Sequence, residues 1–266
     1  VYGIVGLKTH AKMLLVTRRE GKLLKRYGHL STGNYNPKTA RLYTDVSYLT
    51  ANPLLTLDME NVFFHLASQS RLPKLRQLVL APFQLHAKML QMIEALSAAA
   101  ARGEDARLVA KMNALTDEGL ILALVNAGQK GVKIDLIVRG ACMLPAQVPG
   151  VTDNIRVRSI IGRFLEHSRV FYFRSGKTET LYLSSADWMN RNMLRRVELA
   201  WPVEDPKLRQ RIFSECLQTY LQDCVDAWVM NATGQYVKAT PPKSRSATPK
   251  VYTSAQQQLV ALYGGS

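Results

Sequence analysis

Alternating apolar and polar positions predict that most of this chain folds as short β-strands separated by amphipathic helices. The predicted strands cover residues 13–16, 46–49, 75–80, 108–112, 133–138, 170–173 and 197–201. The predicted helices cover about residues 56–66, 86–101, 119–127 and 206–229. Strands that alternate with helices in this way favour an α/β fold with mixed β-sheets flanked by helices.

The same pattern divides the chain into two units and a tail. A first unit over residues 1–77 and a second over 78–235 are separated where Pro73 interrupts the pattern before a new strand. Residues 236–266 form a basic tail, in which the segment 239–249 is rich in Pro, Ser, Thr and Lys. We expect this segment to be a mobile linker and residues 255–263 to form a short helix.

Both units carry the same order of polar residues: a histidine, a basic residue two positions later, a small-polar turn and then a carboxylate. In the first unit these are His10, Lys12, residues 31–34 and Asp45, and in the second they are His167, Arg169, residues 184–187 and Glu198. An offset of 153 positions relates Asn34 to Asp187 and also Asp45 to Glu198. The repeat predicts one active site built from two similar halves.

The chemistry of this pattern favours a nucleophilic histidine. We expect each unit to hold its histidine beside its carboxylate, which would accept the imidazole Nδ1–H and leave the Nε2 lone pair free. The basic residue two positions later would project from the same face of its strand and meet an anionic group. A phosphoryl group is therefore the natural electrophile.

This doubled pattern is similar to that of the phospholipase D superfamily, and longer motifs resemble the C-terminal half of bacterial polyphosphate kinases over about residues 2–240. The motifs lie at residues 6–12, 33–45, 136–142, 153–156 and 182–189. Thr17 stands where superfamily phosphodiesterases usually carry Asp, and Arg169 replaces the second Lys, which disfavours diester hydrolysis. The resemblance implies two phospholipase D-like domains, the first truncated at its N-terminus.

The resemblance also implies a transferase that moves the terminal phosphate of ATP reversibly to long-chain polyphosphate through a phosphohistidine. His10 is then the nucleophile, His167 contacts the γ-phosphate or protonates the leaving oxygen, and Tyr43 contacts the nucleotide. The groups expected to hold phosphate oxygens are Lys12, Arg139 and Arg169. Magnesium is expected with ATP, at positions upstream of His10 that lie outside this chain, and the full-length enzyme is expected to be a homo-oligomer.

Composition agrees with a polyanionic partner. The formal net charge is +15, with 12 basic and 4 acidic residues in the segment 1–77 and 4 basic and no acidic residues in 236–266. Such charge attracts polyphosphate and RNA alike, and the histidine pair favours polyphosphate over a specific nucleic acid. We expect a cytoplasmic protein without membrane insertion, because no apolar run approaches about 20 residues and no leader opens the chain.

Two other classes of function stay open. A phospholipase D-type phosphodiesterase would use the same two histidines and cleave diesters without ATP, whereas an inactive polyanion-binding fragment would bind polyphosphate without forming phosphohistidine. A second His-Ala-Lys at residues 86–88 lies in a helical pattern and is not followed by the small-polar turn and carboxylate of the repeat, so we expect a structural role for it. His29, five residues before Asn34, could line the site or pack on a strand.

Overall fold

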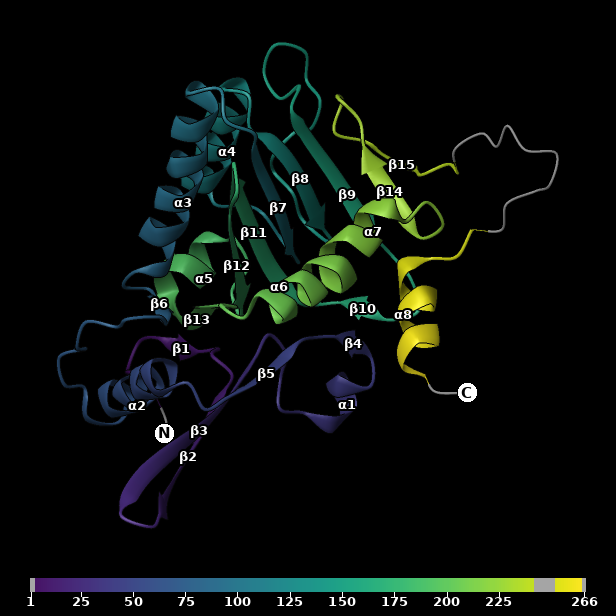
Figure 1. The fold of residues 1–266 in the computed structure, drawn as a ribbon. Helices are drawn as coiled ribbons and strands as arrows, with labels where there is room; N and C mark the ends of the chain where they lie inside the picture. The colour runs from purple at the N-terminus through teal and green to yellow at the C-terminus, as the bar shows by residue number, and fades with distance from the viewer. Residues whose placement is uncertain (1–2, 242–251, 265–266) are drawn as a thin grey trace.

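A computed structural model describes residues 3–241 and 252–264, and its framework is one large mixed sheet. Ten strands of the described chain form this sheet in the order β1-β13-β12-β11-β7-β8-β9-β14-β15, with β6 also paired to β13 (Figure 1). Their bounds are β1 Lys8–Thr9, β6 Val79–Ala81, β7 Ala106–Met112, β8 Lys133–Val138, β9 Ile155–Ile160, β11 Arg169–Ser175, β12 Thr178–Ser184, β13 Arg196–Pro202, β14 Ala227–Met230 and β15 Tyr236–Lys238.

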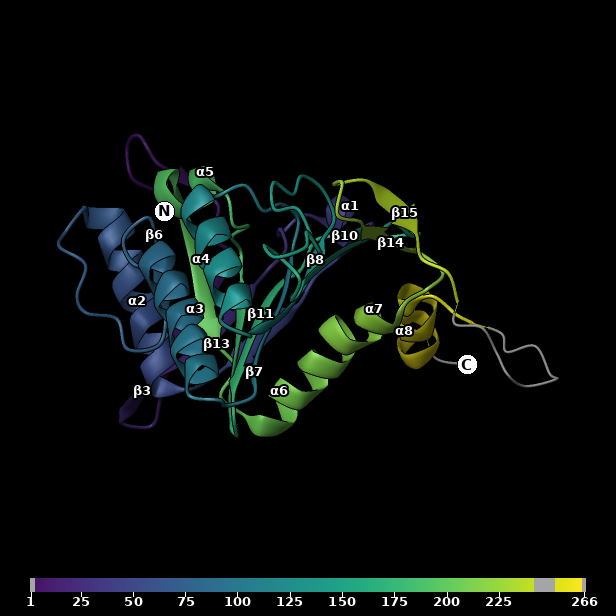
Figure 2. The ribbon, with the colours of Figure 1, turned by 90° about the horizontal axis from the view of Figure 1, so that it is seen from above.

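Helices cover both faces of this sheet (Figure 2). One face carries α3 (Leu85–Ala101) and α4 (Glu118–Gln129), and the other carries α6 (Pro206–Phe213), the π-helical turn η1 (Ser214–Gln218) and α7 (Thr219–Gln222). Alternate residues of β7 serve the two layers: Leu108 and Ala110 join the core under α3, whereas Val109 joins the core that contains Leu217. The predicted α/β fold with a mixed sheet flanked by helices is confirmed.

The first unit adds a smaller antiparallel sheet, of order β2-β3-β5, packed against helix α2. The elements of this region and the remaining short ones are β2 Met13–Glu20, β3 Leu23–Ser31, α1 Pro37–Ala40, β4 Tyr43–Thr44, β5 Ser47–Thr50, α2 Pro53–Ser68, β10 Leu165–Glu166, α5 Asn190–Arg195 and α8 Ala255–Tyr263. Asn52 caps α2 before a proline and Asp205 caps α6 before a proline, again 153 positions apart. The repeat therefore extends to the helices that follow each carboxylate.

Two predicted elements differ from the structure because side chains compete for backbone groups. The strand predicted at 75–80 is reduced to Val79–Ala81, since the Asp58 carboxylate accepts the backbone N–H groups of residues 76–78. The helix predicted over 206–229 ends at Gln222, because the Asp223 carboxylate accepts from Val225 and Asp226 and turns the chain into β14.

The C-terminal segment contains more structure than predicted. Strand β15 lies inside the predicted tail and pairs with β14. The helix predicted at 255–263 is confirmed as α8, whereas most of the predicted linker, residues 242–249, lies outside the described residues. No helix within the described part of the chain is long and apolar enough to cross a membrane.

Candidate active site

Two very short parallel strand pairs bring the units together at the site. In one, Lys8 and Thr9 of β1 pair with Arg196 and Val197 of β13; in the other, β10 pairs with β4. His10 directly follows β1, and His167 directly follows β10, so each histidine lies between two strands rather than within one. Because β13 contains Glu198 and β4 directly precedes Asp45, each histidine meets the carboxylate of the other unit.

The resulting histidine–carboxylate pairs are crossed. His10 Nδ1 lies 2.9 Å from Glu198 Oε2, and His167 Nδ1 lies 2.9 Å from both carboxylate oxygens of Asp45. The expectation that each unit pairs its histidine with its own carboxylate is therefore wrong. The physical reason is the exchange of the two-residue strands between units, which the hydrophobic pattern does not encode.

The surroundings of Glu198 decide which nitrogen of His10 carries the proton. The fully buried carboxylate also accepts from the Ser185 hydroxyl and the Asn192 amide. Ser185 Oγ itself accepts Leu199 N–H, which leaves the hydroxyl proton to donate to Glu198. An ionised carboxylate only accepts, so His10 donates through Nδ1–H and its Nε2 lone pair stays available.

The same arrangement recurs at Asp45. The Thr32 hydroxyl donates to Asp45 Oδ1 over 2.7 Å while Thr32 Oγ1 accepts Val46 N–H over 3.0 Å. Gly33 is required beside this pair, because a Cβ on it would lie 2.2 Å from the Asp45 carboxylate. Thr32 and Ser185 are again 153 positions apart, so the small-polar turn of each unit supports the carboxylate that follows it. Sequence reasoning recognised the turn but assigned no role to Thr32, Ser185 or Asn192.

Lys12 is a buried cation without a counter-ion. Its side chain belongs to a residue only 6% exposed, and Nζ makes no hydrogen bond within the described chain. Burial lowers the pKa of Lys12 to about 8, and the negative charges of Glu198 and Asp45 oppose this shift. The Lys12 ammonium therefore interacts electrostatically with the carboxylates of both crossed pairs. An unpaired ammonium in such a place is poised to receive an anion.

Arg169, the counterpart of Lys12, is already paired. Its Nε and Nη2 donate to Asp187 over 3.1 and 3.0 Å, and Nη1 donates to the carbonyl of His167 over 2.8 Å. The same Nη1 lies 3.2 Å from His167 Nε2. Burial lowers the pKa of His167 and Arg169 lowers it further, while Asp45 opposes the shift. Arg169 thus holds His167 in place and keeps a cation beside its ring, whereas no cationic side chain of residues 3–241 and 252–264 is bonded to His10.

Two more predicted contact residues lie beside His167. Tyr43 places its ring centroid 4.8 Å from that of His167. Arg139 follows β8 and donates through Nε to the carbonyl of Glu166 over 2.7 Å and to Asn113 Oδ1 over 3.3 Å. Bonds through Nε fix the plane of the guanidinium and leave its two terminal nitrogens to reach an anion. The structure thus places Tyr43 against the His167 ring and Arg139 against the residue that precedes His167.

In residues 3–241 and 252–264, no other histidine and no cysteine is hydrogen-bonded to the crossed pairs, although His29 and Cys216 line a pocket that Asp45 also lines. His86 of the second His-Ala-Lys bonds Asp117, the N-cap of α4, over 2.9 Å, in agreement with a structural role. His29 bonds the Tyr35 hydroxyl over 2.8 Å. The three cysteines are free thiols, at positions 142, 216 and 224.

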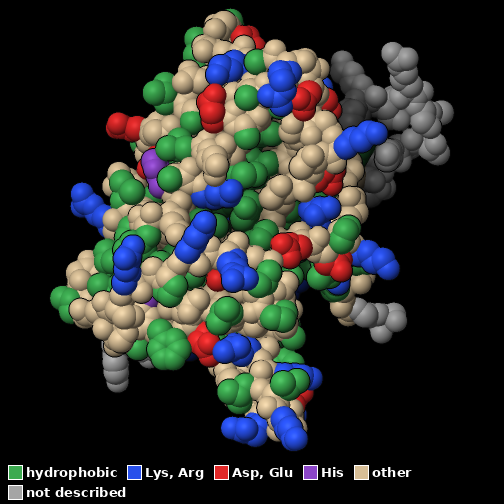
Figure 3. All heavy atoms as spheres, turned by 60° about the vertical axis from the view of Figure 1, so that its left-hand side comes forward, with side chains coloured by type: hydrophobic (Ala, Val, Ile, Leu, Met, Phe, Trp, Pro, Cys, Tyr) green, Lys and Arg blue, Asp and Glu red, His purple; other side chains and the backbone are tan. Residues whose placement is uncertain are grey.

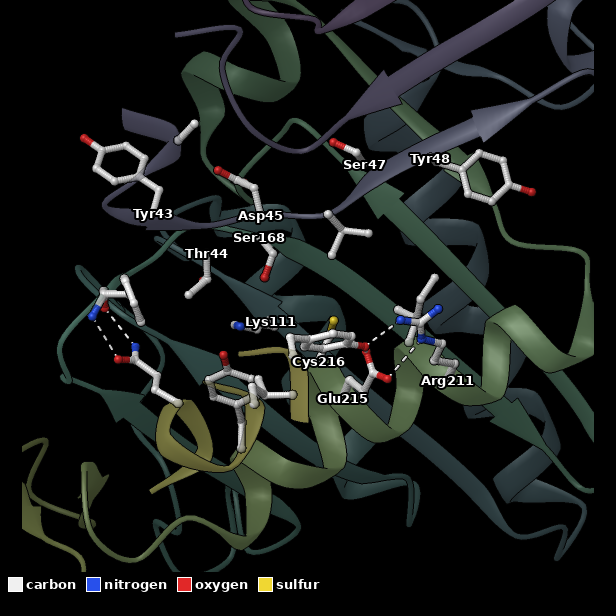
Figure 4. Close-up of a pocket in the computed structure, with 18 of the residues that line it drawn as sticks. Tyr43, Thr44, Asp45, Ser47, Tyr48, Lys111, Ser168, Arg211, Glu215 and Cys216 are labelled. Carbon is white, nitrogen blue, oxygen red and sulfur yellow. Dashed lines mark hydrogen bonds and ion pairs between the residues drawn. The ribbon is translucent and has the colours of Figure 1, made fainter. Parts of the chain in front are cut away.

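An open pocket of about 840 Å³ borders the site on the side of Asp45. Tyr43, Thr44, Asp45 and Ser168 line it from one side, and the segment around Arg211, Glu215 and Cys216 lines it from the other, with Lys111 between them (Figure 4). His10, Lys12 and Arg139 do not line this pocket.

The fold and the site define this chain as a mixed α/β protein with a site of two crossed histidine–carboxylate pairs. Family models place it further: "Polyphosphate kinase C-terminal domain 1" matches residues 1–72 and "Polyphosphate kinase C-terminal domain 2" matches residues 78–249. The chain belongs to the polyphosphate kinase family and corresponds to its C-terminal region.

Individual relatives agree with this assignment. The chain is 52% identical over 241 residues to a polyphosphate kinase of Xylella fastidiosa strain Temecula1, covering 91% of this chain and 34% of the relative. It is 51% identical over 253 residues to a polyphosphate kinase of Pseudomonas aeruginosa, covering 93% and 36%. A crystal structure of polyphosphate kinase from Porphyromonas gingivalis superposes with a TM-score of 0.87 at 33% identity, covering 98% of this chain and 39% of that one. The chain thus spans about a third of the length of these curated relatives.

Proposed function

We propose that this chain carries the phosphoryl-transfer site of a polyphosphate kinase, which moves the terminal phosphate of ATP reversibly to polyphosphate through a phosphohistidine on His10. One observation carries the proposal: His10 has a tautomer fixed by Glu198 and lies in a site that also holds the unpaired ammonium of Lys12. A neutral imidazole with a free Nε2 beside an unneutralised cation suits attack on an anionic phosphorus.

In the forward step, His10 Nε2 forms a bond to the γ-phosphorus as the bond to the bridging oxygen breaks. ADP leaves with the electron pair, and Glu198 stabilises the positive charge that develops on the imidazole. A terminal oxygen of polyphosphate then attacks the same phosphorus, and the P–N electron pair returns to His10. The transition state requires positioning and charge neutralisation, which we assign to Lys12 and Arg139. His167 contacts the γ-phosphate or gives a proton to the leaving oxygen.

A basic surface near the site suits the binding of a polyanion. Lys and Arg side chains gather on the β2–β3 hairpin, which projects at the lower end of the view in Figure 3, and we assign polyphosphate attraction to this surface. Magnesium is proposed to accompany ATP. In residues 3–241 and 252–264 no cluster of three or more His, Cys, Asp or Glu could hold a metal ion, so we assign no step to one. A homo-oligomer in the cytoplasm is likewise a proposal for the whole enzyme.

Labelling with γ-³²P-ATP tests the proposal in a protein of the full family length that contains this chain. An acid-labile, alkali-stable adduct is expected on His10, absent in His10→Gln. The variant His86→Gln is the matched control, because its histidine lies in the same His-Ala-Lys sequence, and it should keep the label. Label on His167, or on no histidine, contradicts the proposal, and diester cleavage without ATP would instead indicate a phosphodiesterase.

Arg139→Lys is expected to lower kcat/KM for ATP about tenfold although the charge is kept. The fixed guanidinium plane offers two terminal nitrogens to phosphate, whereas Lys offers a single point charge and loses the Nε bonds to Glu166 and Asn113. A tenfold loss corresponds to about 1.4 kcal/mol. The exposed Arg102→Lys serves as control. Equal kinetics for wild type and Arg139→Lys would make Arg139 structural.

A further inference from the structure

The C-terminal helix α8 reaches the strand that leads to His167. A capping box between Ser254 and Gln257 fixes the first turn of the helix. Figure 1 shows α8 beside β10, the two-residue strand that ends one residue before His167. The first turn of α8 directs Gln256 inward, where it is only 3% exposed. The helix is thus anchored by its beginning against the active-site strand.

The Gln256 side-chain amide makes the hydrogen bonds to the Phe164 backbone that a neighbouring β-strand would otherwise make. Its Oε1 accepts Phe164 N–H and its Nε2 donates to the Phe164 carbonyl, each over 2.8 Å. Nε2 also donates to Glu166 Oε1 over 2.6 Å. Gly162 leaves the space for this contact, because a Cβ there would lie 2.6 Å from Gln256 Oε1. One side chain therefore holds the backbone at Phe164 and the carboxylate at Glu166.

Glu166 is a charged group in the protein interior. Although burial opposes both charges, Lys111 lowers the pKa of Glu166 and Glu166 raises that of Lys111, so the pair is ionised. Their charged atoms lie 2.6 Å apart and each residue is at most 3% exposed. The Thr44 hydroxyl donates to Oε2 over 2.8 Å, and Gln256 satisfies Oε1. Removing one hydrogen-bond donor leaves the buried Glu166 carboxylate with an unsatisfied oxygen, which lowers the free energy of unfolding.

This network lies directly behind the His167–Asp45 pair. Thr44 precedes Asp45 and Glu166 precedes His167, so the Thr44–Glu166 bond joins the two residues that directly precede the pair. Thr44 Oγ1 also accepts His167 N–H over 3.3 Å. At the corresponding place before His10 stands Thr9, which is exposed and to which no residue of α8 is bonded in the described structure. Among the described residues, such a network supports the second histidine only.

We propose that Gln256 is a positioning residue for phosphoryl transfer: it holds the segment from Phe164 to Glu166 and thereby fixes His167 against Asp45. The inference rests on the proposed function for its consequence in catalysis. Its geometric part concerns the His167–Asp45 pair alone and can be measured without any reaction.

The test compares Gln256→Leu with Gln258→Leu, which makes the same change on the exposed side of α8. NMR titration of His167 in this chain should differ from wild type in Gln256→Leu, because loosening the pair changes both the burial of the imidazole and its bond to Asp45, and it should be unchanged in Gln258→Leu. In the protein of full family length, kcat for polyphosphate synthesis should fall about tenfold in Gln256→Leu, with KM for ATP within about twofold. An unchanged His167 titration, or equal effects in both variants, overturns the proposal.

A second variant separates positioning from a general loss of folding. Gln256→Glu keeps the size and the acceptor for Phe164 N–H, but an ionised carboxyl can donate neither to the Phe164 carbonyl nor to Glu166. A protonated carboxyl has one O–H and can restore the bond to Glu166. The ratio of variant to wild-type kcat should therefore recover as the pH falls from 8 to 6. A deficit that does not vary with pH contradicts the proposal. Were the wild type itself unable to transfer phosphate, the proposed function would fail while the NMR result still decided the role of Gln256.

Discussion

Replacing Glu198 by glutamine is expected to slow phosphohistidine formation roughly 10²–10⁴-fold, because Glu198 both sets the tautomer of His10 and stabilises its positive charge. All three side-chain partners of Glu198, namely His10, Ser185 and Asn192, are donors. An amide in its place turns one of its two acceptor atoms into a donor, so one partner loses its bond. Rapid-quench measurement of the labelled intermediate gives the rate.

The crossed pairing supplies a control within the same site. Glu198→Gln should change the imidazole ¹⁵N chemical shifts of His10 and leave those of His167 unaltered, whereas Asp45→Asn should do the reverse. Pairing within each unit would exchange these two outcomes. An effect of Asp45→Asn on His10 equal to that of Glu198→Gln would therefore contradict the crossed arrangement.

The repeat predicted from the sequence anticipated much of the site, because hydrogen-bonded turns depend on local residue types. Thr32 with Asp45 and Ser185 with Glu198 form the same bonds at the same offset. The crossing itself could not be predicted. It depends on parallel pairs of two residues each, β1 with β13 and β10 with β4, which are too short to show periodicity.

The unequal states of Lys12 and Arg169 were also missed, although a signal for them exists in the sequence. The second turn ends in Asp187, which pairs with Arg169, whereas the corresponding residue of the first turn is Asn34, which has no charge and is exposed. A difference of one residue between the repeats therefore leaves one cation neutralised and the other unpaired. The pKa of Lys12 is lowered because the side chain is buried. The burial of one polar side chain cannot be predicted from the pattern of apolar and polar residues.

Replacing Lys12 by methionine is expected to stabilise the fold and to lower transfer about 100-fold or more. The pKa of Lys12 is about 8 in the folded chain against 10.5 for an ordinary lysine. The unfolded chain therefore binds more protons between pH 8 and 10.5, so the free energy of unfolding rises with pH across that window. Below pH 8 the full penalty applies, about 3 kcal/mol for a shift of this size. Methionine has a similar shape and no charge, so it removes the penalty together with the phosphate contact.

Chemical denaturation at several pH values measures this effect. The free energy of unfolding of Lys12→Met should exceed that of wild type by about 1–3 kcal/mol at pH 7, and the difference should shrink toward pH 10.5. Lys88→Met is the matched control, since Lys88 ends the second His-Ala-Lys and lies on helix α3. Anion binding should also return a proton to Lys12, so calorimetry near pH 9 should detect proton uptake in wild type and none in Lys12→Met. Destabilisation by Lys12→Met, or transfer at the wild-type rate, would show that Lys12 is not the anion contact of this site.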